Sequence, residues 1–153
     1  FTGISLIDII QLREENIFVK EDKTLWVQGK RKKTGTPYSL RLLPQALEII
    51  EKHKGRKSGF VFDAPGKWTV FDTMKVIEKR IGMARPLTFH QGRHCFASLV
   101  TLSNGVPIET VSQMLGHSDI ETTQIYAVVS SEKIEKDMRN VMKRLDGKLQ
   151  LIP

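Results

Sequence analysis

The spacing of apolar residues along the chain predicts a mainly helical protein with a small sheet near its start. Residues 24–28 and 38–42 alternate between apolar and polar positions, which is typical of half-buried strands. They are joined by a basic turn, and residues 60–62 are a candidate third strand. Towards the other end, a helix beginning at Ser131 carries one apolar stripe at i, i+4, i+7 and i+11, formed by Ile134, Met138, Val141 and Leu145.

Capping residues and glycines divide the rest of the chain into further helices. Apolar spacing predicts helices over residues 5–12 and 44–54. A polar N-cap followed three residues later by a polar side chain marks a helix start, and glycine marks a helix end. The expected starts are Thr69 with Asp72, Thr88 with Gln91, Pro107, and Ser118 with Glu121, and the expected ends are Gly82, Asn104-Gly105 and Gly116.

Composition narrows the class of protein. The 153 residues suffice for one domain, and the net charge of +7 favours a polyanionic partner, nucleic acid first and an acidic membrane surface second. The single Cys95 excludes an internal disulfide and a cysteine-based zinc site, and its apolar neighbours predict a buried side chain. Without a leader or an apolar run of the ~18–20 residues that span a bilayer, we expect an intracellular protein.

Four features carry candidate chemistry. His90 and Arg93 share one face at a helix start, a corner that suits a phosphate. His117 follows the helix end at Gly116, and Tyr126 lies nine residues later. A tyrosine becomes a nucleophile where cations stabilise the phenolate and a base takes its proton. Lys33 lies in the basic turn. Each feature alone has a simpler structural explanation. The His90 and Arg93 spacing can arise by chance, and His117 can merely complement the helix dipole. Tyr126 can be a core residue, and Lys33 can belong to a solvated run of charges.

Their joint order, however, resembles the catalytic pattern of the tyrosine recombinases, or phage integrases. The matching segments are Phe1-Thr2-Gly3-Ile4, Lys33-Thr34-Gly35, His90-x-x-Arg93, Leu115-Gly116-His117 and Gln124-Ile125-Tyr126-Ala127. The resemblance implies an α+β, mainly α-helical catalytic domain with a small antiparallel sheet. It also implies site-specific cleavage and rejoining of double-stranded DNA through a 3′-phosphotyrosyl intermediate, with no metal and no cofactor.

The same resemblance implies a role for each site residue. Tyr126 attacks the scissile phosphate, Arg93 and His117 bind its oxygens, His90 takes the tyrosine proton, and Lys33 protonates the 5′-hydroxyl leaving group. The remaining cations of the basic turn are expected to contact DNA, and these are Lys30, Arg31 and Lys32.

One position departs from the family pattern. Ser5 stands where the first motif normally has an arginine. Losing one preorganised donor to a transition-state oxyanion costs about 10²–10³ in rate, so either the enzyme is slow or another cation takes over. Asp8 is expected to brace the site. The residue sequence of this motif resembles that of integrases of Bacteroides-type mobile elements, in which this arginine is often absent. The candidate replacements are Arg13, Arg31, Arg41 and Arg85.

Domain organisation and partners also follow from the resemblance. Residues 1–153 are expected to be the catalytic domain, with an N-terminal core-binding domain lying upstream. The tail, residues 131–153, belongs either to the core or to a docking surface for a neighbouring protomer. We expect a homotetramer on DNA in the full-length protein, a monomer for this chain alone, and a bacterial, cytoplasmic, nucleoid-associated location without membrane contact.

Three other functions are weighed against this one. A type IB topoisomerase uses similar residues, although the compact spacing fits recombinases better. A catalytically impaired DNA-binding module of the same fold is supported by Ser5 alone. A metal-dependent nuclease fits poorly, because the constellation contains no carboxylates.

Overall fold

A three-stranded antiparallel sheet lies near the start of the chain in the computed structural model, which describes residues 1–55, 59–127 and 131–149. Its order is β1 (Ile17–Val19), β2 (Leu25–Lys30) and β3 (Pro37–Arg41). The two predicted strands are thus confirmed with shifted bounds. The predicted strand at 60–62 is wrong, because Phe60 forms only an isolated bridge with Arg13. The sequence pattern misses β1, since three residues are too few to display a period of two.

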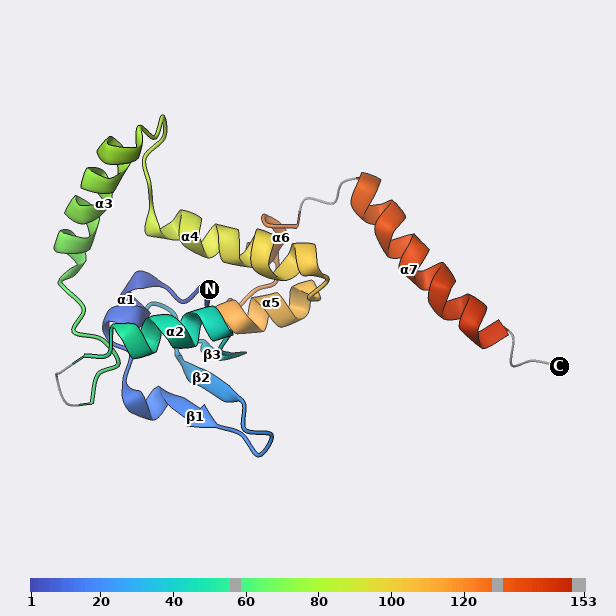
Figure 1. Cartoon of the computed structure of the whole chain (residues 1–153), viewed down its shortest axis with the longest axis horizontal. Coiled ribbons are helices and arrows are strands. Elements are labelled where there is room, and N and C mark those ends of the chain that lie inside the picture. The colour runs from blue at the N-terminus through green and yellow to red at the C-terminus, as the bar shows by residue number, and fades with distance from the viewer. Residues whose placement is uncertain (56–58, 128–130, 150–153) are drawn as a thin grey trace.

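Helices make up most of the remaining structure. Figure 1 shows α5 beside the sheet and α7 extending away from the body. A short 3₁₀ turn, Glu14–Asn16, precedes β1. The α-helices are α1 (Leu6–Ile10), α2 (Pro44–Lys52), α3 (Lys67–Ile81), α4 (Phe89–Cys95), α5 (Ile108–Leu115), α6 (Glu121–Gln124) and α7 (Ser131–Leu149).

The expected helix beginning at Thr88 continues past α4 in a wider form. A π-helical segment, Phe96–Thr101, and a 3₁₀ turn, Leu102–Asn104, follow α4 without a break in the rod. The rod ends at Gly105, whose φ of +83° is readily adopted by glycine. The predicted extent and end of this helix are therefore confirmed. Widened turns of this kind are frequent near functional sites.

The core lies between the sheet and α5. Val27 of β2, Leu40 of β3, and Val111 and Leu115 of α5 are at most 1% exposed. α5 packs against β3 on one side and α6 on another. Two segments far apart in the sequence are thereby held together, and the end of α5 is fixed close to the turn after β2.

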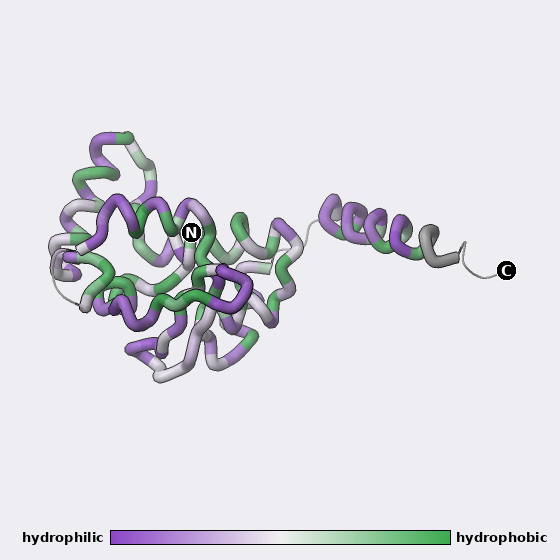
Figure 2. Tube along the Cα trace, turned by 60° about the horizontal axis from the view of Figure 1, so that its bottom comes forward, coloured by the Kyte–Doolittle hydropathy of each residue, from purple (hydrophilic) through white to green (hydrophobic). Residues whose placement is uncertain are grey.

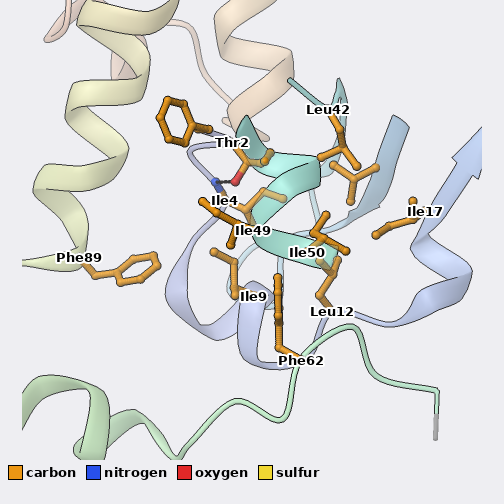
Figure 3. A pocket seen from close by; sticks show the side chains of 13 residues that line it. Thr2, Ile4, Ile9, Leu12, Ile17, Leu42, Ile49, Ile50, Phe62 and Phe89 are labelled. Atoms are coloured by element: carbon orange, nitrogen blue, oxygen red, sulfur yellow. Dashed lines mark hydrogen bonds between the residues drawn. The ribbon is translucent and has the colours of Figure 1, made fainter. Parts of the chain in front are cut away.

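An apolar pocket of about 260 Å³ opens beside this core, between α1 and α2 (Figure 3). Ile9, Leu12, Ile50 and Phe62 contribute to its wall. Polar atoms are scarce around it; one is the Thr2 hydroxyl, which accepts a hydrogen bond from the Ile4 amide. This pocket therefore extends the hydrophobic core and holds none of the predicted catalytic residues.

Two predicted capping boxes are wrong. The α3 helix begins earlier than expected, with Gly66 as its N-cap, and the Thr69 carbonyl accepts a hydrogen bond from Thr73 inside the helix. The α6 helix begins at Glu121, whose amide binds the Asp119 carboxylate at 3.0 Å, so Asp119 takes the part expected of Ser118. These two predictions are wrong because several neighbouring residues could each serve as the N-cap, and the sequence signature does not distinguish among them.

Two expected burials are also wrong. Cys95 is exposed, because its position on α4 faces away from the core. The predicted apolar face of α3 contains no buried residue, and Ile81 is 64% exposed.

The α7 helix is confirmed, with its apolar stripe open to solvent along the rod seen in Figure 2. Ile134 and Met138 are each 54% exposed, and Leu145 is 50% exposed. Within the part of the chain described here, no helix has the length and apolar character needed to cross a membrane.

Candidate active site

The capping box at the start of α4 sets the position of His90 and Arg93. The Thr88 hydroxyl accepts from the Gln91 amide at 3.2 Å, and the Gln91 side-chain oxygen accepts from the Thr88 amide at 2.6 Å. This predicted cap is confirmed. Because the cap fixes the first turn, the two site residues lie one turn apart on the same face of the helix. Arg93 is only 5% exposed.

Arg93 joins three distant parts of the chain. Its Nη1 donates to the carbonyl oxygen of Gly3 at 2.6 Å, and its Nη2 donates to that of Leu115 at 2.6 Å. The same Nη2 lies 2.8 Å from Nε2 of His117. Gly3 has a φ of +64°, and a Cβ there would come within 2.4 Å of the Phe96 ring. Only glycine therefore lets this carbonyl reach the guanidinium.

His117 is oriented from both sides of its ring. Gly116 ends α5 with a φ of +64° and turns the chain so that His117 faces Arg93. Its Nδ1 lies 2.8 Å from the hydroxyl of Thr123, which is fully buried. Burial, followed by the charges of Arg93, Arg31 and His90, lowers the pKa of His117 to about 4. The imidazole is therefore neutral at pH 7.

Tyr126 follows α6 and lies against this pair. Its side chain is 5% exposed, and its ring lies nearly parallel to that of His117, with centroids 6.2 Å apart. The edge-on ring of His94 is closer, at 4.2 Å. Burial and Arg31 lower the pKa of Arg93 to about 10, while a hydrogen bond to Tyr126 acts in the opposite direction. Arg93, His117 and Tyr126 thus converge, as the sequence predicts.

Arg31, one of the cations expected to contact DNA, points from the basic turn towards the end of α5. Its Nη1 donates to the Leu115 carbonyl at 3.1 Å, the same oxygen that Arg93 binds. Its Nε lies 3.1 Å from the Asp8 carboxylate, an ion pair without hydrogen-bond alignment. A Cβ on Gly116 would come within 2.9 Å of the Arg31 side chain. The two guanidiniums therefore lie side by side at the end of α5.

Asp8 contacts both Arg31 and Ser5, the position where the family pattern has an arginine. The Asp8 carboxylate accepts from the Ser5 hydroxyl and, at 2.8 Å, from the Lys32 amide. Asp8 thus braces the site, as the sequence predicts. The three other candidate cations lie elsewhere: Arg13 stacks on Phe60, and Arg41 and Arg85 are exposed outside the site. Arg31 is the candidate that lies beside both Ser5 and Arg93.

A cationic groove of about 630 Å³ runs past Arg93. His90 lines it, and burial, with the charges of His94, Arg93 and Arg31, lowers the pKa of His90. Other cations come from the turn after β2 and from the start of α3; they are Arg31, Lys32, Lys33 and Lys67. Lys33 is exposed and lines the groove, whereas Tyr126 does not line it. Lys30 is exposed at the end of β2.

Two site residues were missed by sequence reasoning. His94 contacts Tyr126, and its ring also lies 5.9 Å from that of His90. It could have been found from its i, i+4 spacing to His90 on one helix face. Thr123 could not, because a threonine three residues before a tyrosine carries no chemical signal until its contact with His117 is known.

Comparisons with known proteins agree with this geometry. The model of the phage integrase family matches residues 2–133. The tyrosine recombinase XerD of Listeria innocua is 29% identical over 149 residues, which cover 88% of this chain and 48% of that protein. The chain thus spans about half the length of this curated relative.

Two solved structures share the fold. The XerH site-specific recombinase bound to its difH substrate has a TM-score of 0.66 at 19% identity, covering 90% of this chain and 43% of that one. The catalytic domain of bacteriophage HP1 integrase has a TM-score of 0.64 at 20% identity, covering 90% of this chain and 74% of that one. The predicted fold class, a mainly helical recombinase catalytic domain with a small antiparallel sheet, is confirmed.

Proposed function

The chain belongs to the phage integrase family, and from this premise we propose that it carries the catalytic centre of a site-specific DNA recombinase with Tyr126 as nucleophile. One observation carries the proposal: Arg93, His117 and Tyr126 converge, although they come from three separate elements. A core tyrosine would not need the buried Arg93 beside it, because Arg93 donates to neutral carbonyls and an imidazole, and burying a cation without an anionic partner costs free energy. A phosphate in the adjoining groove would supply that partner.

The reaction is a transesterification. The Tyr126 oxygen bonds to the scissile phosphorus as the bond to the 5′ oxygen breaks, leaving a 3′-phosphotyrosyl link. The phenolic proton passes to His90, which is neutral because its pKa is lowered. Lys33 donates a proton to the departing 5′ oxygen. Attack by a 5′-hydroxyl from another strand reverses these steps, so the phosphodiester energy is conserved and no cofactor or metal is consumed.

Arg31 takes over the part of the arginine that Ser5 replaces. Its guanidinium lies beside that of Arg93 on a shared carbonyl, so both can turn donors towards the same non-bridging phosphate oxygens. Asp8 orients it through an ion pair. Through Arg31 the site retains two guanidiniums despite Ser5, which argues for an active enzyme over an impaired binding module.

The finer assignments rest on the same resemblance. The Ser5 motif supports a relationship with integrases of Bacteroides-type mobile elements, and thus a bacterial, nucleoid-associated recombinase. Residues 1–153 would form the catalytic domain, with a core-binding domain upstream. The exposed stripe of α7 supports docking onto a neighbouring protomer in a tetramer on DNA, with the free chain a monomer.

A covalent-trapping experiment tests the proposal. A nicked suicide duplex carrying the attachment site should give a protein–DNA adduct with the wild type, because loss of the short cleaved strand prevents religation. Tyr126→Phe keeps the ring packing but lacks the oxygen that forms the bond, so it should give none. Binding without an adduct under every condition would support the impaired module. Relaxation of supercoils without strand exchange would instead favour the type IB topoisomerase.

A further inference from the structure

Thr123 is a fully buried hydroxyl at the centre of the site. Its side chain, on α6, is 0% exposed, and its Oγ1 lies 2.8 Å from Nδ1 of His117. The opposite ring nitrogen, Nε2, lies 2.8 Å from Nη2 of Arg93. The imidazole is therefore held between one group that can only donate and one that can donate or accept.

These two contacts determine where the ring proton lies. Arginine has no acceptor, so Nε2 of His117 must present its lone pair to Arg93. A neutral imidazole then carries its proton on Nδ1 and donates it to the Thr123 hydroxyl. The lowered pKa of His117, about 4, agrees with a neutral ring.

The proposed reaction requires the opposite arrangement. Non-bridging phosphate oxygens only accept hydrogen bonds, so His117 can bind one through Nε2 only when that nitrogen carries the proton. In a neutral ring, Nδ1 is then the lone-pair nitrogen and needs a donor beside it. A hydroxyl is suited to both states, because rotation about its C–O bond exchanges its donor and acceptor roles.

We propose that Thr123 is a positioning residue whose hydroxyl keeps His117 in place while the ring changes from accepting a hydrogen bond from Arg93 to donating one to the scissile phosphate. The inference rests on the proposed function and deepens it. The ring releases the Nδ1 proton to water and takes one from water at Nε2, so its charge does not change. Arg93 is freed in the same step to turn its Nη2 towards the phosphate.

A pair of variants separates the hydroxyl from the shape of the side chain. Thr123→Val keeps the branched shape but leaves Nδ1 without a partner, and we expect adduct formation to slow by about ten- to a hundredfold. Thr123→Ser keeps the hydroxyl but loses a buried methyl, and we expect its rate to stay within about threefold of wild type. Unfolding of both variants by urea shows whether a loss of folding explains the loss of rate.

The ring proton itself can be observed independently of activity. Long-range ¹H–¹⁵N correlation spectra of the ¹⁵N-labelled protein without DNA, assigned by comparison with His117→Gln, distinguish the two neutral tautomers. We expect the Nδ1–H form from pH 6 to 8. The charged or titratable neighbours of the ring within the described residues are Arg93, Arg31, His90 and Tyr126, and neither Thr123→Val nor Thr123→Ser replaces any of them.

Each outcome is decisive. Nε2–H as the main tautomer of the wild type would overturn the inference, and so would equal rates for Thr123→Val and wild type. Equal losses in the Val and Ser variants would reduce Thr123 to a packing residue. A wild type that forms no adduct would overturn the proposed function and this inference with it, so the two failures are distinguishable.

Discussion

At the scale of single residues, the site depends on how each charged or polar group is paired. Arg93 donates hydrogen bonds to two backbone carbonyls and to one imidazole, and Arg31 donates to one of the same carbonyls. Two cations beside each other in a buried place favour any neighbouring group that stays neutral or becomes negative. Burial is the main cause of the lowered pKa values of His90 and His117, and neighbouring charges, those of Arg93 and Arg31 among them, lower both further. The same two cations would suit a phosphate in the groove.

Removing Arg31 should therefore be costly. We expect Arg31→Ala to reduce the rate of adduct formation by about 10²–10³, the effect of one lost oxyanion donor. Arg31→Lys should recover only part of this, because an ammonium lacks the planar fork. Single-turnover cleavage of the suicide duplex measures the effect. Arg41→Ala is the control, since Arg41 is exposed outside the site.

A second substitution tests whether Arg31 replaces the family arginine. Adding Ser5→Arg to the Arg31→Ala variant should restore part of the activity, because Asp8 would then pair with the new guanidinium. No recovery, together with a folded double variant, would mean that Arg31 acts in some other way.

The neutral state of His117 predicts a dependence of stability on pH. Its pKa falls from the usual 6.5 to about 4 on folding, so between these values the unfolded chain binds more protons than the folded one. Stability contributed by the neutral ring is therefore fully present above about pH 6.5 and is lost as the pH falls towards 4. His117 is partly exposed, and solvent screening limits the loss to roughly 1–2 kcal/mol.

Urea unfolding at pH 7 and pH 4.5 measures this loss. His117→Gln cannot titrate, so its stability should change less than that of the wild type between the two pH values. Identical changes in the two proteins would contradict a lowered pKa for His117.

At the scale of elements, the site residues lie near the ends of helices. Arg93 lies in the first two turns of α4, and His117 follows the Gly116 cap that ends α5. Sequence rules predict these ends because capping acts within one turn. The Thr88 box and the Gly82, Gly105 and Gly116 stops were predicted and are confirmed, and each of these glycines has a positive φ. The boxes at Thr69 and Ser118 failed because local context permits several starts.

We expect Gly116 to tolerate substitution by alanine less well than a glycine that only ends a helix. Gly116→Ala would strain a φ of +64° and also bring a Cβ within 2.9 Å of Arg31. Gly82→Ala is the matched control, with a φ of +66° and nothing within 4 Å of the added Cβ. Each should lose about 1–2 kcal/mol of stability from backbone strain, as measured by urea unfolding. Only Gly116→Ala should also slow adduct formation; equal rates would show that Arg31 can shift at no cost.

At the scale of the whole molecule, two helices lack partners along part of their length. The described residues of α3 include no buried one, and the apolar stripe of α7 is about half exposed along its length. An exposed apolar stripe of this size marks an interaction surface more often than an isolated surface residue does. We therefore propose that the α7 stripe mediates contact between protomers on DNA.

One charge placed in the stripe tests this assignment. Met138→Asp should prevent the assembly of several protomers on the attachment site, while Asn140→Asp, off the stripe, should leave assembly intact. Both variants should remain folded, because Met138 is 54% exposed. Analytical ultracentrifugation of protein–DNA complexes distinguishes a monomer from a tetramer. Normal assembly by Met138→Asp would contradict docking through α7.

The sequence by itself determined the order of most of the helices and of two strands, several helix ends and three members of the site, because periodicity, capping and motif order are local properties. Only the tertiary structure decided which arginine accompanies Arg93, which groups touch Tyr126 and which apolar faces stay open. Those answers depend on contacts between residues 84 and 90 positions apart, such as Arg31 with Leu115 and Arg93 with Gly3. No local pattern encodes them, since the packing of α5 on the sheet brings these groups together.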